Sequence, residues 1–491
     1  MRMPPYACDD FVRQRGFALL TALIALSLFS IIGLSLALLA TSEVKTSDNY
    51  ENHIQARAAA MAGLNHGRAL LRGIQFDDLL LGPDGTYDSD PASMARARTH
   101  AFRLPVDWSA ARYLDMLNPA VPLSGDDGIM NTGWHPSGAG LVLIPAAGIA
   151  QTAPNPYDPG VLVISRYFVK VTDNNGDESE IAADPAGNPF YDGDSQVILR
   201  SLGIGQTLSE TTQNGNRRNS VVVFEARFMR PLMFDLDAAL VVQSNSVEPV
   251  SAPMFSGETF SIHGGGQPGI ATIDLVPGDG TSPAQQILSR LTATQAPRIQ
   301  GNSVAPSISD ITAAVSAHAE KRRIMDAPLL CNFLNQSLPQ FADNIFAGSQ
   351  TWAGSAPSSL GSYDPSQPQS APGQNPKATL VAGDLYVDGS LAGGGLLVVA
   401  GSLTIRGNFS YSGLVLVLGG ELDVGGFGTV TGSLFAASLS CSNVAAWGTT
   451  KLAIRDSCRV VFDRQAVRMA LSLIPPRQLG FREITHVIDP E

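Results

Sequence analysis

Residues 16–42 contain no Asp, Glu, Lys or Arg, and this uncharged run constrains the fold more than any other feature of the chain. About 20 consecutive apolar residues in an α-helix cross the hydrocarbon core of a membrane, where a helix satisfies its own backbone hydrogen bonds. Arg13 and Arg15 precede the run and Glu43 follows it. Because basic residues stay on the cytoplasmic side, we expect one membrane helix with its N-terminus in the cytoplasm.

The predicted helix continues beyond the membrane. No proline occurs between Phe17 and Arg72, and after Ala40 apolar residues recur at spacings of three and four, the pattern of an amphipathic helix. A helix over these residues would be about 84 Å long at 1.5 Å per residue. No Ala-x-Ala cleavage site follows the apolar run, so it differs from a secretory signal peptide and is expected to be retained.

The N-terminus resembles that of a type IV prepilin, with a short basic leader (residues 1–16) ending at Gly16 and an aromatic residue, Phe17, opening the apolar helix. This resemblance implies that a prepilin peptidase cleaves between these two residues and that the new amine is methylated. It also implies insertion in the bacterial inner membrane with a periplasmic C-terminal part. The implied partners are the assembly platform and other pilins or pseudopilins. A plain single-pass anchor is the alternative.

Two features of the predicted helix favour a minor subunit. Residues 56–64 (Ala-Arg-Ala-Ala-Ala-Met-Ala-Gly-Leu) resemble a stretch of PilX-type minor pilins and of K-type pseudopilins. Most major pilins have a glutamate where this chain has Thr21, and that glutamate neutralises the N-terminal amine of a neighbouring subunit. Because an unpaired buried charge is costly, the resemblance implies a priming or tip position. The alternative is that Thr21 is simply tolerated.

The spine helix, residues 17–72, is expected to pack on a pilin-like head formed by residues 73–235. β-branched and aromatic residues in residues 161–171, 196–200 and 221–228 predict three strands of an antiparallel sheet. The fold class is therefore predicted as α+β, with a long helix on an antiparallel sheet and a β-rich C-terminal domain.

An acidic loop follows the first predicted strand. Oxygen side chains at alternate positions are typical calcium ligands, but an EF-hand loop needs glycine in its sixth position and Gly176 is in the fourth. Asn175-Gly176 is also an ordinary hairpin signal. Calcium and a solvated acidic turn both remain open. The candidate ligands are Asp173, Asn175, Asp177, Asp192 and Asp194.

The C-terminal half contains an internal repeat. Gly395, Gly413 and Gly432 lie 18 and 19 residues apart and separate short apolar segments, which predicts parallel β-helix-like repeats over residues 378–440. A mixed α/β middle region (236–347) and a Ser/Pro/Gly-rich linker (348–377) precede the repeats. A C-terminal cap (441–491) is expected to cover one end with a short helix at residues 464–470.

The cysteines leave the disulfide pattern open. Cys8 lies in the leader, so processing would leave Cys331, Cys441 and Cys458. A disulfide between Cys441 and Cys458 is possible in an oxidising periplasm, and free buried cysteines are the alternative.

The net charge of −12 argues against a nucleic-acid partner. No His-Glu-x-x-His or Gly-x-Ser-x-Gly motif occurs, and the ionisable residues of the repeats are scattered. We therefore expect a minor pilin or pseudopilin rather than an enzyme, with no cofactor other than the calcium considered above. The alternatives are an adhesin anchored through the prepilin route and a membrane-tethered carbohydrate-active enzyme.

Overall fold

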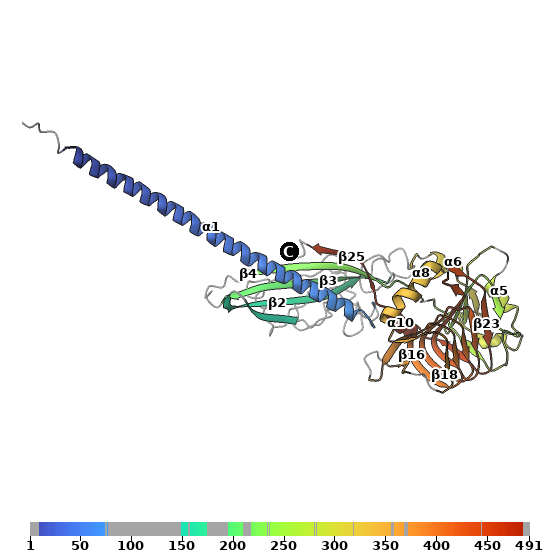
Figure 1. Ribbon diagram of the computed structural model, residues 1–491. Coiled ribbons are helices and arrows are strands. Elements are labelled where there is room, and N and C mark those ends of the chain that lie inside the picture. The colour runs from blue at the N-terminus through green and yellow to red at the C-terminus, as the bar shows by residue number, and fades with distance from the viewer. Residues whose placement is uncertain are drawn as a thin grey trace, which may run out of the picture.

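The computed structural model describes residues 9–73, 76, 149–155, 158–173, 195–209, 218–232, 234, 236–278, 280, 282–317, 319–354, 358–367, 372–442 and 444–484. A long N-terminal helix projects from an antiparallel sheet, and a larger body of parallel strands lies at the opposite end of the molecule (Figure 1).

Helix α1 (Asp9–Leu70) packs on a five-stranded sheet of order β1-β2-β3-β4-β25, which we call the head sheet. All neighbouring strands in it are antiparallel. The three strands predicted from sequence lie within β2, β3 and β4, whereas β1 and β25 were not predicted. The strands are β1 (Ile149–Asn155), β2 (Asp158–Asp173), β3 (Gln196–Ser209), β4 (Arg218–Met229) and β25 (Arg477–Ile484).

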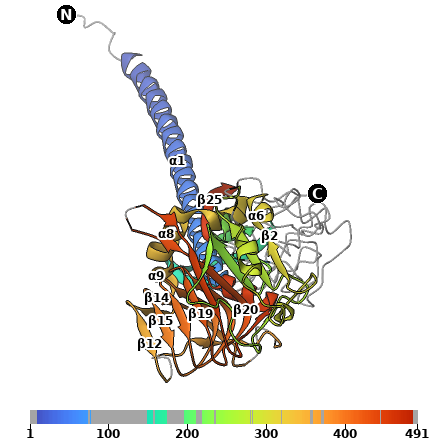
Figure 2. The same ribbon diagram turned by 90° about the vertical axis from the view of Figure 1, so that its right-hand side faces the viewer.

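Residues 236–474 form a second unit, which we call the β stack (Figure 2), and its named strands pair in parallel except at β13–β14 and β21–β22. Its larger sheet has the main order β10-β8-β5-β20-β18-β16-β14-β11, and its smaller sheet has the order β12-β15-β17-β19-β23-β6. The larger sheet contains β5 (Leu240–Ser244), β7 (Ser261–His263), β8 (Ile270–Asp274), β9 (Ile299–Gln300), β10 (Ile308–Asp310), β11 (Asn344–Phe346), β13 (Gly361–Ser362), β14 (Asn375–Val381), β16 (Ser390–Val399), β18 (Asn408–Val417), β20 (Thr429–Ala437) and β24 (Arg459–Phe462). The smaller sheet contains β6 (Val247–Pro249), β12 (Gln350–Trp352), β15 (Leu385–Val387), β17 (Leu403–Ile405), β19 (Glu421–Val424) and β23 (Thr450–Ile454), and a separate hairpin pairs β21 (Leu439–Ser440) with β22 (Ala446–Trp447).

The predicted repeat is visible in the register of the larger sheet. Gly395 of β16 pairs with Gly413 of β18, which pairs in turn with Gly432 of β20. Each has a positive φ, a conformation that glycine adopts without steric cost. The spacing of the glycines in sequence is therefore the spacing of successive parallel strands.

Both faces of the larger sheet are buried, which explains its nearly continuous apolar runs. Leu397, Val415 and Leu434 face a core between the two sheets. Leu396 and Leu414 face a second core beneath short helices. Among these, α10 contacts β14, β16, β18 and β20, so it covers a sheet face and not an end as predicted. The short helices are α5 (Pro283–Leu288), α6 (Thr312–Ala317), α7 (Ala319–Arg322), α8 (Ala327–Asn332), α9 (Leu338–Phe341) and α10 (Arg464–Ser472), with 3-10 turns at Ala296–Arg298 and Arg323–Met325 and a π-helical turn at Phe333–Ser337.

Several predicted boundaries differ from the structure. Residues 236–347 are not a separate middle region, because β5 pairs in parallel with β20 and β8 pairs with β5. Residues 348–377 are not only a linker, because Trp352 of β12 is buried in the stack and β14 begins at Asn375. Residues 441–491 are not only a cap, because β25 joins the head sheet. All three predicted boundaries are wrong because strands pair with segments that are distant in sequence.

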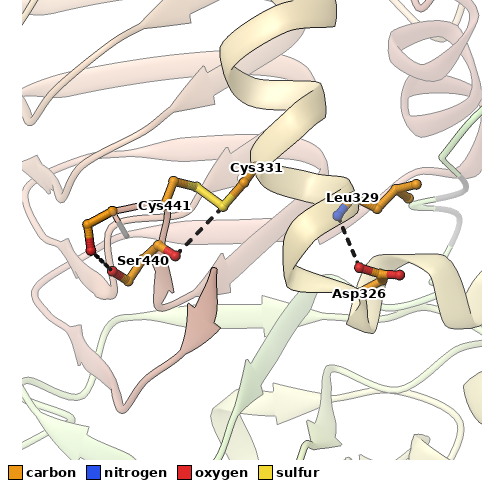
Figure 3. The surroundings of a disulfide bond; sticks show 6 residues. Asp326, Leu329, Cys331, Ser440 and Cys441 are labelled. Atoms are coloured by element: carbon orange, nitrogen blue, oxygen red, sulfur yellow. Dashed lines mark hydrogen bonds between the residues drawn. A yellow bond between two sulfur atoms is a disulfide. The ribbon is translucent and has the colours of Figure 1, made fainter. Parts of the chain in front are cut away.

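A disulfide joins Cys331 of α8 to Cys441, just after β21 (Figure 3). The predicted pairing of Cys441 with Cys458 is wrong. Cys458 is a free thiol within the core between the two sheets, whereas α8 lies over the other face. Burial raises the pKa of the Cys458 thiol to about 12, with the charge of Asp456 adding to this and a backbone hydrogen bond from Arg455 opposing it.

We expect Cys441→Ala to lower the free energy of unfolding of the β stack by about 2–4 kcal/mol, because the disulfide closes a long loop. The loop spans 110 residues. Urea unfolding followed by tryptophan fluorescence would measure the change. The double variant Cys331→Ala, Cys441→Ala should lose no more than either single variant, and additive losses would show that the two thiols act separately.

A buried carboxylate and two partly exposed arginines form an ion network across three neighbouring strands of the smaller sheet, since Arg406 directly follows β17 and Arg455 directly follows β23. Asp423 of β19 is 4 % exposed. Arg406 donates to both of its carboxylate oxygens, at 2.9 and 2.6 Å, and Arg455 Nε donates to Oδ1 at 2.9 Å. Burial acts to raise the pKa of Asp423, but the hydrogen bonds and charges of the two arginines outweigh it and hold the pKa below its ordinary value.

The network should make the stack sensitive to acid. Because the folded pKa of Asp423 is lowered, its contribution is present above the ordinary pKa of about 3.9 and is lost as the pH falls below that value. We expect Asp423→Asn to cost about 1.5–3 kcal/mol at pH 7, the usual range for hydrogen bonds to charged groups. Urea titrations at pH 7 and pH 3 should show a smaller difference between variant and wild type at pH 3. An equal difference at both pH values would contradict this assignment.

Candidate functional site on the N-terminal helix

The first part of α1 has no cover in the described part of the chain. Every described side chain from Phe17 to Tyr50 is exposed, including Ile24, Phe29 and Leu36. None of the most apolar part of the helix is buried. This is the one helix in the described residues that is long and apolar enough to span a membrane.

Hydroxyl groups in this segment hydrogen bond within the helix. Thr21 Oγ1 donates to the carbonyl oxygen of Phe17 at 3.0 Å, and Ser30 Oγ donates to that of Leu26 at 2.9 Å. Ser27, Ser35 and Thr41 donate in the same way to carbonyl oxygens three or four residues earlier. Because these donors find their acceptors on the helix itself, they do not require water, and the segment is compatible with an apolar environment.

The second part of α1 packs closely on the head sheet. Ala56 and Ala60 are fully buried against Val222 and Phe224 of β4. A Cβ atom on Gly203 of β3 would lie 2.0 Å from the carbonyl oxygen of Ala56 and 2.3 Å from the amide nitrogen of Ala60. The small residues of α1 and the absence of a side chain at Gly203 therefore allow the helix backbone to touch the sheet.

A polar contact and an aromatic contact border this interface. His53 Nδ1 lies 3.5 Å from Ser220 Oγ, and the guanidinium carbon of Arg57 lies 5.9 Å from the ring centroid of Phe224, within the range of a cation–π interaction. The helix therefore has two distinct parts, one bare and apolar and one fixed to a sheet.

Comparison with models of known protein families, with curated proteins and with solved structures gives no match for this chain.

The residues predicted for processing lie in the first turns of α1. The helix begins at Asp9, whereas the predicted helix began at Phe17. The Gly16–Phe17 bond therefore lies within the helix and not at its start. Arg13 and Arg15 belong to the same turns. Residues 1–8 of the predicted leader lie outside the described residues. No proline or glycine between Asp9 and Arg15 interrupts the helix.

The predicted calcium ligands are not brought together by the described residues. Asp173 is the last residue of β2, and its side chain lies outside the described part. Asn175, Asp177, Asp192 and Asp194 also lie outside it. The described residues contain no group of three or more His, Cys, Asp or Glu side chains placed to hold a metal ion. The calcium site therefore stays a prediction.

Sequence reasoning missed the residues that fix the helix to the sheet. Gly203 lies in Leu-Gly-Ile-Gly (residues 202–205), which is an ordinary strand sequence apart from its glycines. A glycine inside a strand often marks a close backbone approach, and this was the available signal. The stretch at residues 56–64 was identified by its resemblance, and the structure adds the physical reason for its small residues.

Proposed function

We propose that this chain is a minor pilin or pseudopilin, cleaved after Gly16 and assembled at a priming or tip position of a type IV pilus or a type II secretion pseudopilus. The observation that carries the proposal is the unequal burial of α1. Its first part is apolar and bare, and its second part is fixed to an antiparallel sheet. Lipid would cover the bare part before assembly, and the helices of neighbouring subunits would cover it afterwards.

The leader and Thr21 support the same proposal. Arg13 and Arg15 favour a cytoplasmic N-terminus, which places the Gly16–Phe17 bond at the membrane surface where a prepilin peptidase acts. Thr21 has no carboxylate, and its hydroxyl donates a hydrogen bond within its own helix, so it cannot neutralise the N-terminal amine of another subunit. A subunit without that carboxylate fits a position at the end of a filament better than a repeated position.

The disulfide supports a periplasmic location for the β stack, because disulfides persist in oxidising compartments. We infer further that the stack is a β-helix, in which segments of the two parallel sheets alternate along the chain from β14 to β19. Inner-membrane insertion with the stack on the periplasmic side follows from these two inferences and from the leader charges.

The test is the N-terminal sequence and intact mass of the protein from membranes of cells with and without prepilin peptidase. A peptidase-dependent start at Phe17 is expected. Gly16→Leu should abolish processing, whereas Gly33→Leu should not, because a Cβ at Gly33 meets nothing within 4 Å and the change lies in the same helix. An intact Met1 terminus in both strains would leave a tethered protein and exclude the filament proposal.

A further inference from the structure

The chain leaves the head sheet and returns to it at one point. β4 ends at Met229, β25 begins at Arg477, and these two residues are paired in the antiparallel register. Without the intervening residues, β4 and β25 would form an ordinary hairpin. All of the β stack is therefore inserted between two neighbouring strands of one sheet.

β25 is fastened to the head sheet by side-chain contacts as well as by strand pairing. Arg482 of β25 donates through Nε to Glu225 of β4 at 2.8 Å, and Arg200 of β3 donates to the other carboxylate oxygen at 2.7 Å. Phe481 lies 4.8 Å from Phe224, measured between ring centroids. The last strand thus completes the unit that the first strands began.

Among the residues that the structure describes, the head and the stack contribute to separate hydrophobic core clusters. Both large cores of the stack are built from residues between 232 and 474, with no member from α1 or the head sheet. The small core under α1 contains Ala56, Ala60, Val222 and Phe224 and no residue of the stack. Units with their own cores are expected to fold independently.

The two units contact each other at the end of β4, where Arg323 Nη1 of the stack donates to Met229 Sδ at 2.8 Å, and at the C-terminal end of α1. Arg72 Nη2 donates to the carbonyl oxygen of Phe341 at 2.8 Å and to Asp343 Oδ1 at 3.2 Å, and the amide of Gly73 donates to the carbonyl oxygen of Ser472 at 2.8 Å. These contacts join the stack to the end of the helix, where Figure 1 shows it.

We propose that residues 231–475 are an independently folding module inserted into the β4–β25 hairpin. We propose further that the head, meaning α1 with the head sheet, is anchored in the membrane through α1 and is processed without this module. The second part of the proposal rests on the proposed function. The module is then the part that the head displays outside the membrane, and the head is sufficient for anchoring.

The first experiment uses the full chain in detergent, with specific protease sites inserted after Pro231 and after Pro475. Calorimetry should show two unfolding transitions, and cutting both sites should leave the midpoint of the stack within a few degrees of its uncut value, whereas the head keeps β25 only through its strand pairing. A site inserted after Gly354, within the stack, is the control, and cutting there should lower only the transition of the stack. A single transition, or loss of both units on cutting at the two junctions, would overturn the proposal.

The second experiment replaces residues 231–475 with Asn-Gly, which favours a two-residue hairpin turn. The shortened chain should accumulate in membranes and be processed within about twofold of the wild-type level, and its degradation or lack of processing beside a processed wild type would overturn the inference. If the wild type itself starts at Met1, the proposed function fails, while the calorimetry still decides whether the module is independent.

Discussion

Gly413→Ala is expected to unfold the β stack while leaving the head intact. Gly413 has a φ of +144°, and a Cβ there would lie 2.0 Å from the carbonyl oxygen of Gly395 on the neighbouring strand. Backbone strain of this kind costs about 1–3 kcal/mol, and overpacking costs about 1–3 kcal/mol more. Because the obstructing atom is backbone, the two strands must separate, and we expect a total loss of roughly 2–6 kcal/mol.

The measurement is calorimetry of the full chain, where the transition of the stack should disappear or move to a much lower temperature. Gly354→Ala is the matched control, because Gly354 lies in the same unit and a Cβ there meets nothing within 4 Å. If the two variants unfold at the same temperature, the close packing of Gly395, Gly413 and Gly432 is not what holds the strands in register.

Gly203→Val is expected to detach α1 from the head sheet. Its side chain would occupy the space now taken by the backbone of Ala56 and Ala60, so the helix must move away as a whole. Overpacking typically costs about 1–3 kcal/mol and occasionally more, and we expect a loss of about 3 kcal/mol because no flexible side chain is available to yield. The bare apolar part of α1 should still enter the membrane.

Trypsin cleavage at Arg57 and Arg68 of α1 would detect this detachment, because a helix held on the sheet resists proteolysis. Gly480→Val is the matched control, since it makes the same change in β25 of the same sheet, where a Cβ meets nothing within 4 Å. Equal protection of the helix in the two variants would show that the close approach at Gly203 is not required for docking.

Local sequence signals predicted the elements that depend on neighbouring residues. The uncharged run gave the helix, and the β-branched segments at residues 161–171 and 221–228 lie inside β2 and β4. Gly395, Gly413 and Gly432 gave the parallel register because each repeat aligns with the next one along the chain. In all of these cases the signal and its structural partner lie close together in sequence.

Features that depend on pairing between distant segments were not predicted from the sequence. Nothing in Arg477–Ile484 indicates that it pairs with β4 and not with the repeats, and nothing in Leu240–Ser244 indicates that it pairs with β20. The prediction of the disulfide pairing was wrong for the same reason, because the partner of Cys441 is decided by the sheet face on which α8 lies. The proposed cleavage site depends on a resemblance and on an exposed helix, and the pairing of the strands has no bearing on it.

The parallel pairing of β5 with β20 also has a consequence for the time course of folding under the proposed function. Ser433 Oγ donates to the carbonyl oxygen of Ala238 across 195 residues of chain, so in a chain exported as proposed β5 would cross the membrane long before β20. Pairing over such separations is slow, and until β20 arrives β5 presents an unpaired apolar edge. If the chain is exported as proposed, the incomplete sheet must therefore be protected from aggregation until the rest of the chain has been translocated.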